Sequence, residues 1–181
     1  FNLNSIRAYR VYLSEKGLGK GSQNAYLIAL RSFIKYLART GVVVLPLDLI
    51  ELIKTPERQI KVLTAIQINC LMTRPRLKKP SGLRDRAILE MLFATGLRVS
   101  ELCGLNRSDI DFKTGEFSVL GKGGRVRPIF LSKRASGWLK QYLSGRRDKE
   151  TALFVTSPKR LSRLQPRVVQ KLVKKYALKA N

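Results

Sequence analysis

Histidine is absent from the 181 residues, and cysteine occurs only twice, at Cys70 and Cys103. Zinc sites are built from clustered cysteine and histidine side chains, so these two distant cysteines exclude a zinc finger. The missing histidine also excludes the Ser–His and Cys–His pairs of many hydrolytic enzymes. We expect both cysteines to be small apolar core residues in a reducing compartment.

Long apolar runs are also missing. The longest extends from Val42 to Ile53. Pro46, Asp48 and Glu51 interrupt it, so it is too polar to span a bilayer. No stretch has the pattern of a signal peptide. The sequence therefore predicts a soluble, cytoplasmic protein without a membrane partner.

Acidic side chains are scarce, because 12 Asp and Glu stand against 36 Lys and Arg, a net charge of +24. Self-repulsion on this scale disfavours a compact chain unless a polyanion offsets it, and nucleic acid is the usual polyanion. Residues 1–60 hold nine basic and four acidic side chains, whereas residues 61–181 hold 27 and eight. Most of the nucleic-acid surface is therefore expected in the second part. Composition alone also fits a generic basic protein.

Hydrophobic periodicity predicts a mainly helical chain with a small antiparallel sheet. Gly17 and Gly41 mark the ends of the first two helices, and Ser22 is expected to cap the second. Apolar runs on both sides of the glycine-rich stretch 121–124 predict a β-hairpin. Helices are expected over residues 3–17, 22–41, 64–71, 83–95, 99–105, 132–143 and 168–176, the hairpin over Phe117–Leu131 and a short strand over Leu153–Val155.

Two polar stretches separate these elements. Residues 55–63 are polar and basic, which predicts a linker. Residues 73–86 are rich in Pro, Lys and Arg, which predicts an exposed loop. The second helix carries the apolar residues Tyr26, Ala29, Leu30, Phe33, Ile34 and Leu37. Two amphipathic helices make a poor core on their own, so we expect them either to pack on the rest of the chain or to be part of a larger helical domain.

Two short motifs could suggest other chemistry. Asp109 and Asp111 could belong to a metal-dependent nuclease, but the sequence positions no other carboxylate beside them, which favours turns and caps. The stretch GKGG at 121–124 lacks the spacing and the strand-to-helix setting of a phosphate-binding loop. Taken alone it is a hairpin tip.

The most specific signal combines three segments: ATGLRVSELCGL at 94–105, SDID at 108–111 and GKGGRVRPI at 121–129. This combination resembles the tyrosine recombinase (phage-type integrase) family, close to its Xer-like members, and the resemblance covers most of the chain. In that family a tyrosine forms a 3′-phosphotyrosyl link to DNA without metal, nucleotide or other cofactor. The resemblance implies double-stranded DNA as the partner, and a homotetramer of the full-length protein on two DNA sites.

The resemblance also implies roles for individual residues. Arg98 matches the first catalytic arginine, whose guanidinium can donate two hydrogen bonds to the scissile phosphate. The break before it would place Arg98 at a helix start, where phosphate is also favoured. Lys122 matches the lysine that protonates the departing 5′ oxygen. Glu101, three residues after Arg98, either orients that arginine or caps its helix.

Five further basic side chains are candidate DNA contacts. Arg125 and Arg127 follow the hairpin tip, where they are either phosphate contacts or solvated strand residues. Arg58 and Lys61 lie in the basic linker, and Lys20 lies near the start of the second helix.

Other family features are missing from these residues. Without histidine there is no His-x-x-Arg box, and no nucleophile is assigned. Tyr176 follows a segment that echoes the one before the family's nucleophile, but the flanking boxes are absent, so we interpret Tyr176 as a core residue. The resemblance predicts the C-terminal part of a helical core-binding (SAM-like) domain at 1–54, the linker at 55–63 and a partial catalytic domain at 64–181. Such a polypeptide is expected to bind DNA without cleaving it.

Two other functions stay open at this stage. One is a non-catalytic DNA-binding module or regulator that retains the recombinase fold. The other is a generic RNA-binding protein, which the joined motifs disfavour and which a preference for single-stranded or structured RNA would support.

Overall fold

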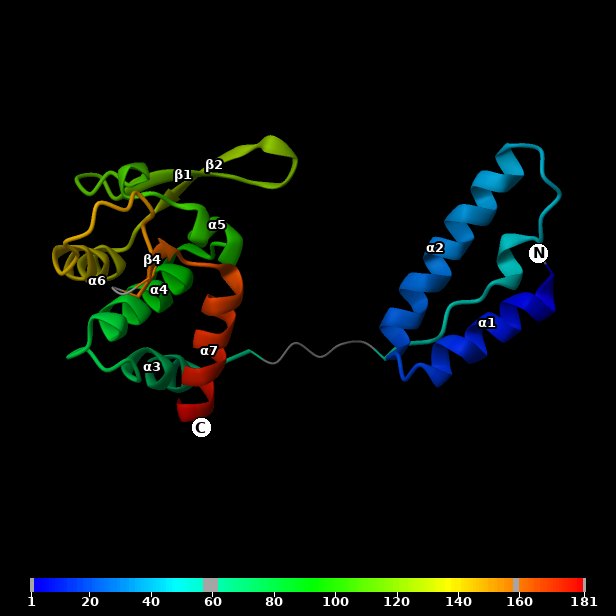
Figure 1. Ribbon diagram of the computed structural model, residues 1–181, viewed down its shortest axis with the longest axis horizontal. Helices are drawn as coiled ribbons and strands as arrows, with labels where there is room; N and C mark the ends of the chain where they lie inside the picture. The colour runs from blue at the N-terminus through cyan, green and yellow to red at the C-terminus, as the bar shows by residue number, and fades with distance from the viewer. Residues whose placement is uncertain (1, 57–61, 158–159, 181) are drawn as a thin grey trace. The chain divides into compact units, whose positions relative to one another are not determined.

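The computed structural model divides the chain into Phe1–Lys61 (unit 1) and Val62–Asn181 (unit 2) (Figure 1). It describes residues 2–56, 62–157 and 160–180, without the side chains of residues 122, 157 and 160. The chain is mainly helical with two small antiparallel sheets, which confirms the predicted fold class. The elements are α1 (Leu3–Glu15), α2 (Lys20–Arg39), η1 (Leu47–Leu49), α3 (Ala65–Thr73), α4 (Pro80–Thr95), α5 (Val99–Gly104), η2 (Arg107–Asp109), β1 (Glu116–Leu120), η3 (Lys122–Gly124), β2 (Val126–Phe130), α6 (Lys133–Ser144), β3 (Val155–Ser157), β4 (Arg160–Arg163) and α7 (Pro166–Ala180).

Unit 1 is a pair of helices closed by the segment that follows them. The carboxamide oxygen of Asn2 accepts a hydrogen bond from the backbone N–H of Ser5 at 2.8 Å and so caps α1. The side chain of Asn24 on α2 both donates to and accepts from the backbone of Ile53 at 2.8 Å, which ties the returning segment to the helix. Ile6, Leu27, Ile34 and Ile50 form the buried core cluster of the unit, and Leu13 of α1 is buried as well.

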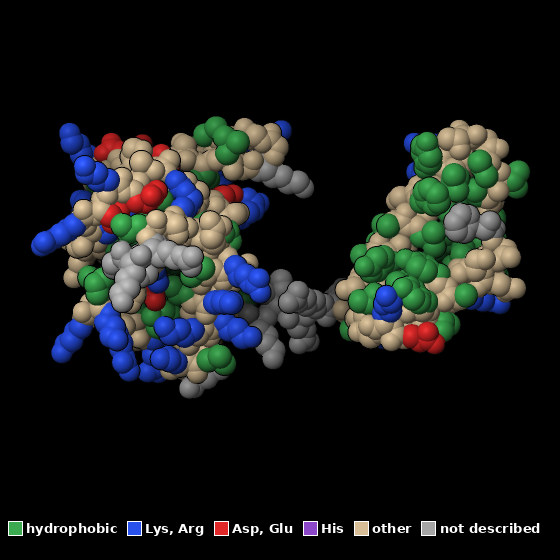
Figure 2. Space-filling view, in the orientation of Figure 1, with side chains coloured by type: hydrophobic (Ala, Val, Ile, Leu, Met, Phe, Trp, Pro, Cys, Tyr) green, Lys and Arg blue, Asp and Glu red, His purple; other side chains and the backbone are tan. Residues whose placement is uncertain are grey.

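One expectation for α2 was wrong. The helix begins at Lys20, not at Ser22, because the Gly19 carbonyl already accepts from the N–H of Ser22 at 2.9 Å. Among the apolar residues of α2, Tyr26 and Phe33 are about half exposed, and Ala29 is exposed too. α2 carries apolar residues on more than one face, so periodicity alone cannot select the face that packs. Figure 2 shows hydrophobic side chains over the visible face of unit 1.

The centre of unit 2 is α4, which packs against α6 and α7 (Figure 1). Ala87, Ile88, Leu89 and Met91 are successive or nearly successive residues, yet each is at most 3% exposed. A helix that is apolar on every side must be covered on every side. This explains why α3, α6 and α7 all pack against α4. No helix in the described parts of the chain is long and apolar enough to cross a membrane.

The exposed loop expected over residues 73–86 was wrong in its second half. α4 begins at Pro80, which suits the first turn of a helix because proline lacks the N–H that would be unpaired there. Asp85 and Arg86 are buried within this helix. The Arg86 guanidinium lies 2.9 Å from the Glu90 carboxylate, so its charge is compensated. Charged composition predicts exposure only where the charges are unpaired.

Tyr176 lies in the core of unit 2, where it is 5% exposed. Its hydroxyl group donates a hydrogen bond of 2.8 Å to the Asp85 carboxylate. Burial and this hydrogen bond raise the pKa of Tyr176 to about 12. The hydroxyl is therefore protonated at neutral pH and engaged within the protein. Asp85 also pairs with Arg84 at 2.8 Å, which completes a buried polar cluster.

The hairpin expected over residues 117–131 is present. β1 and β2 pair antiparallel, with Phe117 opposite Ile129 and Val119 opposite Arg127. Pro128 is tolerated because the sheet has only two strands and each of them has a free edge. Inward-facing Phe117, Val119 and Ile129 join the core of unit 2.

A second hairpin was only half expected. The predicted strand at 153–155 is observed at Val155–Ser157, and it pairs with β4 (Arg160–Arg163), which the sequence did not indicate. Leu153 and Phe154 are instead core residues that precede the strand. β4 contains two arginines and a serine in four residues, so it lacks the alternation by which strands are recognised.

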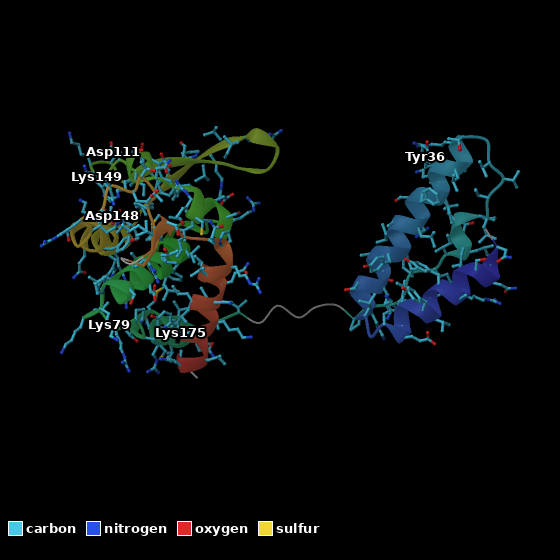
Figure 3. All side chains as sticks on the ribbon, viewed as in Figure 1. Tyr36, Lys79, Asp111, Asp148, Lys149 and Lys175 are labelled. Atoms are coloured by element: carbon cyan, nitrogen blue, oxygen red, sulfur yellow. The ribbon has the colours of Figure 1, made fainter. Side chains whose placement is uncertain are left out.

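Asp148 organises the loop after α6 (labelled in Figure 3). Its carboxylate accepts from Arg146 at 2.6 Å, from Arg107 at 2.7 Å and from the Glu150 backbone N–H at 3.1 Å. These donors, Arg146 first, lower the pKa of Asp148 from 3.8 to about 2. The contacts of Asp148 therefore favour its ionised form and stabilise the folded state of unit 2.

Acidification is expected to remove the stability that Asp148 contributes. Because the folded pKa is depressed, the contribution is complete above the ordinary value of 3.8 and is lost as the pH falls through about 2. Its size is on the order of 1–2 kcal/mol. The free energy of unfolding should thus differ between wild type and Asp148→Asn at pH 5, and the difference should shrink at pH 2.5. A difference independent of pH would contradict the assignment.

Candidate active site

The site begins where α4 ends. Gly96 adopts the left-handed conformation, with φ of +60°, and terminates the helix. The Thr95 hydroxyl donates to the Met91 carbonyl at 2.6 Å and accepts from the Leu97 N–H at 3.3 Å, which fixes the turn. Arg98 then becomes the N-cap residue of α5. The helix start expected at Arg98 is therefore present.

Glu101 contacts both the backbone and the side chain of Arg98. One carboxylate oxygen accepts from the Arg98 backbone N–H at 2.8 Å, and the other accepts from its guanidinium at 2.7 Å. Led by the backbone hydrogen bond, these contacts lower the pKa of Glu101. The Glu101 side chain is 10% exposed, whereas that of Arg98 is 63% exposed. Glu101 thus caps α5 and also holds an arginine that remains open to solvent.

The β1–β2 hairpin brings further cations to Arg98. Arg127 on β2 donates at 2.9 Å to the same Glu101 oxygen that accepts from the Arg98 backbone N–H. An open depression of about 410 Å³ lies between the helix start and the hairpin. Three of its five lining residues are arginines, so it is suited to an anion. Its lining residues are Gly96, Arg98, Gly121, Arg125 and Arg127.

The other candidate residues are placed as follows. The backbone of Lys122 opens the turn η3 at the tip of the same hairpin, and its side chain lies outside the described residues. Lys20 is the first residue of α2 in unit 1 and is exposed. Arg58 and Lys61 lie outside the described residues. The structure therefore brings together Arg98, Glu101, Arg125 and Arg127, and the role of each stays a prediction.

Arg163 is a residue that sequence reasoning missed. Its guanidinium donates to the carbonyls of Cys103, Gly104 and Leu105 at 2.7–3.0 Å, at the C-terminal end of α5. A cation there satisfies the carbonyls that a helix leaves unpaired. Arg163 thus anchors the short helix whose other end carries Arg98. No local signal could have found it, because it lies on β4, far along the chain.

The paired aspartates after α5 make turn contacts. Asp109 accepts from the Asn106 backbone N–H at 2.8 Å, and Asp111 accepts from the Lys113 backbone N–H at 2.7 Å. Both contacts are those that the turn interpretation predicts. Cys103 behaves as a buried apolar residue, and burial raises the pKa of its thiol.

Arginine and lysine side chains differ in how far they are engaged in ion pairs within the protein. Every ion pair within the described parts of the chain uses an arginine. Lysine is compact, strongly hydrated and flexible, so it gains less from such fixed pairs. Basic side chains project from the visible face of unit 2 in Figure 2. The exposed lysines of unit 2 are Lys78, Lys79, Lys113, Lys133, Lys140, Lys149, Lys171, Lys174, Lys175 and Lys179.

An arginine fixed at a helix start, beside a cationic hairpin, makes a site suited to an anion such as a phosphate group. The sequence profile of the phage integrase family matches residues 61–181. A tyrosine recombinase XerC of Thermodesulfovibrio yellowstonii is 36% identical over 181 residues, which cover 93% of this chain and 60% of the relative. A XerC of Pelobacter propionicus is 43% identical over 142 residues, covering 76% of this chain and 46% of the relative.

Two solved structures extend the comparison. The XerA recombinase is 27% identical with a TM-score of 0.59, covering 99% of this chain and 62% of that one. A lambda integrase dimer bound to a COC′ core site is 19% identical with a TM-score of 0.74, covering 99% and 65%. The chain belongs to the phage integrase family, the tyrosine recombinases, which confirms the resemblance read from its motifs. It spans about half the length of the curated relatives that it matches.

Proposed function

We propose that the chain is part of a site-specific DNA recombinase that cuts and rejoins strands through a 3′-phosphotyrosyl intermediate. The observation that supports this most is the exposed guanidinium of Arg98, held by Glu101 beside an arginine-lined depression and the Lys122 hairpin. Its relatives carry the name of tyrosine recombinases, and the lambda integrase was solved bound to DNA. Duplex DNA is accordingly the proposed partner.

Arg98 and Lys122 have different roles in the proposed cleavage step. Arg98 donates to the non-bridging oxygens of the scissile phosphate, where negative charge increases in the transition state. Its planar guanidinium can donate two parallel hydrogen bonds, which an ammonium group cannot do. Lys122 protonates the departing 5′ oxygen, for which an ammonium on a long flexible stem is suited. We propose that the side chains of Arg125 and Lys20 contact the phosphate backbone of DNA, together with those of Arg58 and Lys61 in the linker.

The 181-residue polypeptide is proposed to bind duplex DNA without cleaving it. Its sequence holds no histidine for a His-x-x-Arg box, and the hydroxyl of Tyr176 is buried against Asp85. Residues 1–54 would be part of a helical core-binding domain, 55–63 a basic linker and 64–181 part of a catalytic domain. The whole protein would act in the cytoplasm as a homotetramer on two DNA sites.

Arg98→Lys is expected to reduce covalent complex formation at least about 100-fold, because it removes the bidentate donor to the transition state. The assay uses the natural full-length gene product and a nicked DNA substrate that traps the phosphotyrosyl link. DNA affinity should change less than about threefold, since the charge is kept. The matched control is Arg167→Lys, which changes an exposed arginine on α7 and should behave as wild type.

The same assay separates the alternative function. A full-length product that binds duplex DNA tightly but forms no covalent complex would support a non-catalytic regulator with the recombinase fold. Equal covalent yields from wild type and Arg98→Lys would refute the assignment of Arg98.

A further inference from the structure

Arg127 differs from its neighbours on the hairpin because its guanidinium turns toward the body of unit 2. Its Nη2 donates to Glu101 at 2.9 Å, and its Nε is buried without a partner in the described structure. The side chain is 41% exposed, against 63% for Arg98. Arg125, two residues earlier, is exposed and lines the same depression. Part of the hydrogen-bonding capacity of Arg127 is therefore used within the protein.

The carboxylate that Arg127 contacts is shared. One oxygen of Glu101 accepts from the Arg98 guanidinium, while the other accepts from the Arg98 backbone and from Arg127. Glu101 thereby joins the first turn of α5 to strand β2. A single carboxylate therefore connects the start of α5, where Arg98 lies, to the hairpin whose tip carries Lys122.

Arg127 also lies at the boundary between the anchored and the free parts of the hairpin. It is opposite Val119, which is 6% exposed and packs in the core. The next pair toward the tip, Leu120 and Val126, is 69% and 63% exposed. In Figure 1 the tip projects away from the helices of unit 2. Beyond Arg127, the turn that carries Lys122 has no apolar anchor within the described structure.

We propose that Arg127 is a positioning residue, which sets the turn of Lys122 relative to Arg98 through Glu101. The inference rests on the proposed function, because it assumes that Lys122 acts on the leaving oxygen. A general acid must lie within hydrogen-bond reach of the atom it protonates, and a displacement of about 1 Å can cost about 100-fold in rate. Loss of the Glu101–Arg127 contact therefore lowers cleavage through Lys122, with little effect on DNA affinity.

The test compares a normal cleavage substrate with one whose scissile 5′ oxygen is replaced by sulfur. A thiolate departs without a proton, so a defect confined to the general acid disappears with the sulfur substrate. In the full-length gene product, Arg127→Met is expected to cleave the normal substrate about 10–100-fold more slowly and the sulfur substrate within about threefold of wild type. Arg127→Lys keeps a cation near Glu101 and should recover most of the loss.

Two reference variants make the outcomes distinct. Lys122→Ala should be rescued by sulfur, and Arg98→Lys should not be. If wild type cleaves but Lys122→Ala is not rescued, the proposed role of Lys122 fails, and the inference fails with it. If Lys122→Ala is rescued but Arg127→Met is not, the proposed function stands and the positioning role of Arg127 is refuted.

Two measurements on the 181-residue protein complete the test. Salt dependence of duplex binding should be the same for Arg127→Met and wild type, whereas a phosphate contact would reduce the slope by about one. Hydrogen exchange of the Gly121 amide, which donates to the Arg125 carbonyl at 2.8 Å, should become about tenfold faster in Arg127→Met. A lower salt slope with unchanged exchange would overturn the proposal in favour of a direct DNA contact.

Discussion

Raising the salt concentration from 50 to 200 mM is expected to weaken duplex DNA binding by the 181-residue protein about 10³-fold or more. Neutralised phosphates release their counterions, and the free energy of that release falls as salt rises. The chain carries a net charge of +24, and within its described parts no lysine is held in an ion pair. The lysines can therefore contact DNA phosphates. A 10³-fold loss of affinity over this salt range requires contacts to about six or more phosphates.

Fluorescence anisotropy of a labelled duplex, titrated at four salt concentrations, measures this effect. A plot of log affinity against log salt should be linear with a slope near −6 or steeper. A slope near −1 would contradict a broad phosphate interface. Titrating single-stranded and structured RNA at matched salt is the control, because tighter binding to either RNA than to duplex DNA would revive the RNA-binding interpretation.

Features encoded within a few residues could be predicted from the sequence. Thr64 caps α3 as expected, with the Gln67 N–H donating to its hydroxyl at 3.3 Å and its own N–H donating to the Gln67 side chain at 2.9 Å. Ser132 caps α6 through the Ala135 N–H at 3.2 Å. The Arg98–Glu101 contact belongs to the same group. Each of these contacts joins residues three apart, so a motif contains the whole interaction.

Features that join distant segments could not be predicted. Arg163 reaches α5 from β4, and Tyr176 reaches Asp85 from α7. The Arg127–Glu101 contact joins a strand to a helix across the site. The residues next to an arginine in the sequence do not show whether it makes such a long-range contact or is solvated. For the same reason, the two arginines of α4 suggested a loop, although both Arg84 and Arg86 are paired and Arg86 is buried.

The exposed face of α2 illustrates a related limit. Tyr26 and Leu27 are adjacent apolar residues, yet one is 50% exposed and the other is fully buried. Both choices of inward face satisfy a helical period. The packing of α1 and of the returning segment selects Leu27, and neither partner is visible in the local pattern.

Gly82→Ala is expected to destabilise unit 2 by roughly 3 kcal/mol or more. A Cβ atom at position 82 would lie 1.9 Å from the carbonyl oxygen of Arg76 and 2.6 Å from its carbonyl carbon. The obstacle is backbone, not a flexible side chain. This carbonyl also accepts from the Lys79 N–H at 3.1 Å in the turn before α4. Relief of the clash must therefore move the start of the central helix.

Chemical denaturation followed by tryptophan fluorescence measures the loss, because the single tryptophan, Trp138, lies in unit 2 with the Arg86 guanidinium 4.7 Å from its ring centroid. Gly137→Ala is the matched control. Gly137 lies inside α6, and a Cβ atom added there would meet no described atom within 4 Å, so alanine should stabilise unit 2 by about 0.5–1 kcal/mol. Opposite signs at the two glycines would attribute the loss at position 82 to the contact with Arg76. If Gly82→Ala matched Gly137→Ala, the close approach of the two backbones would be refuted.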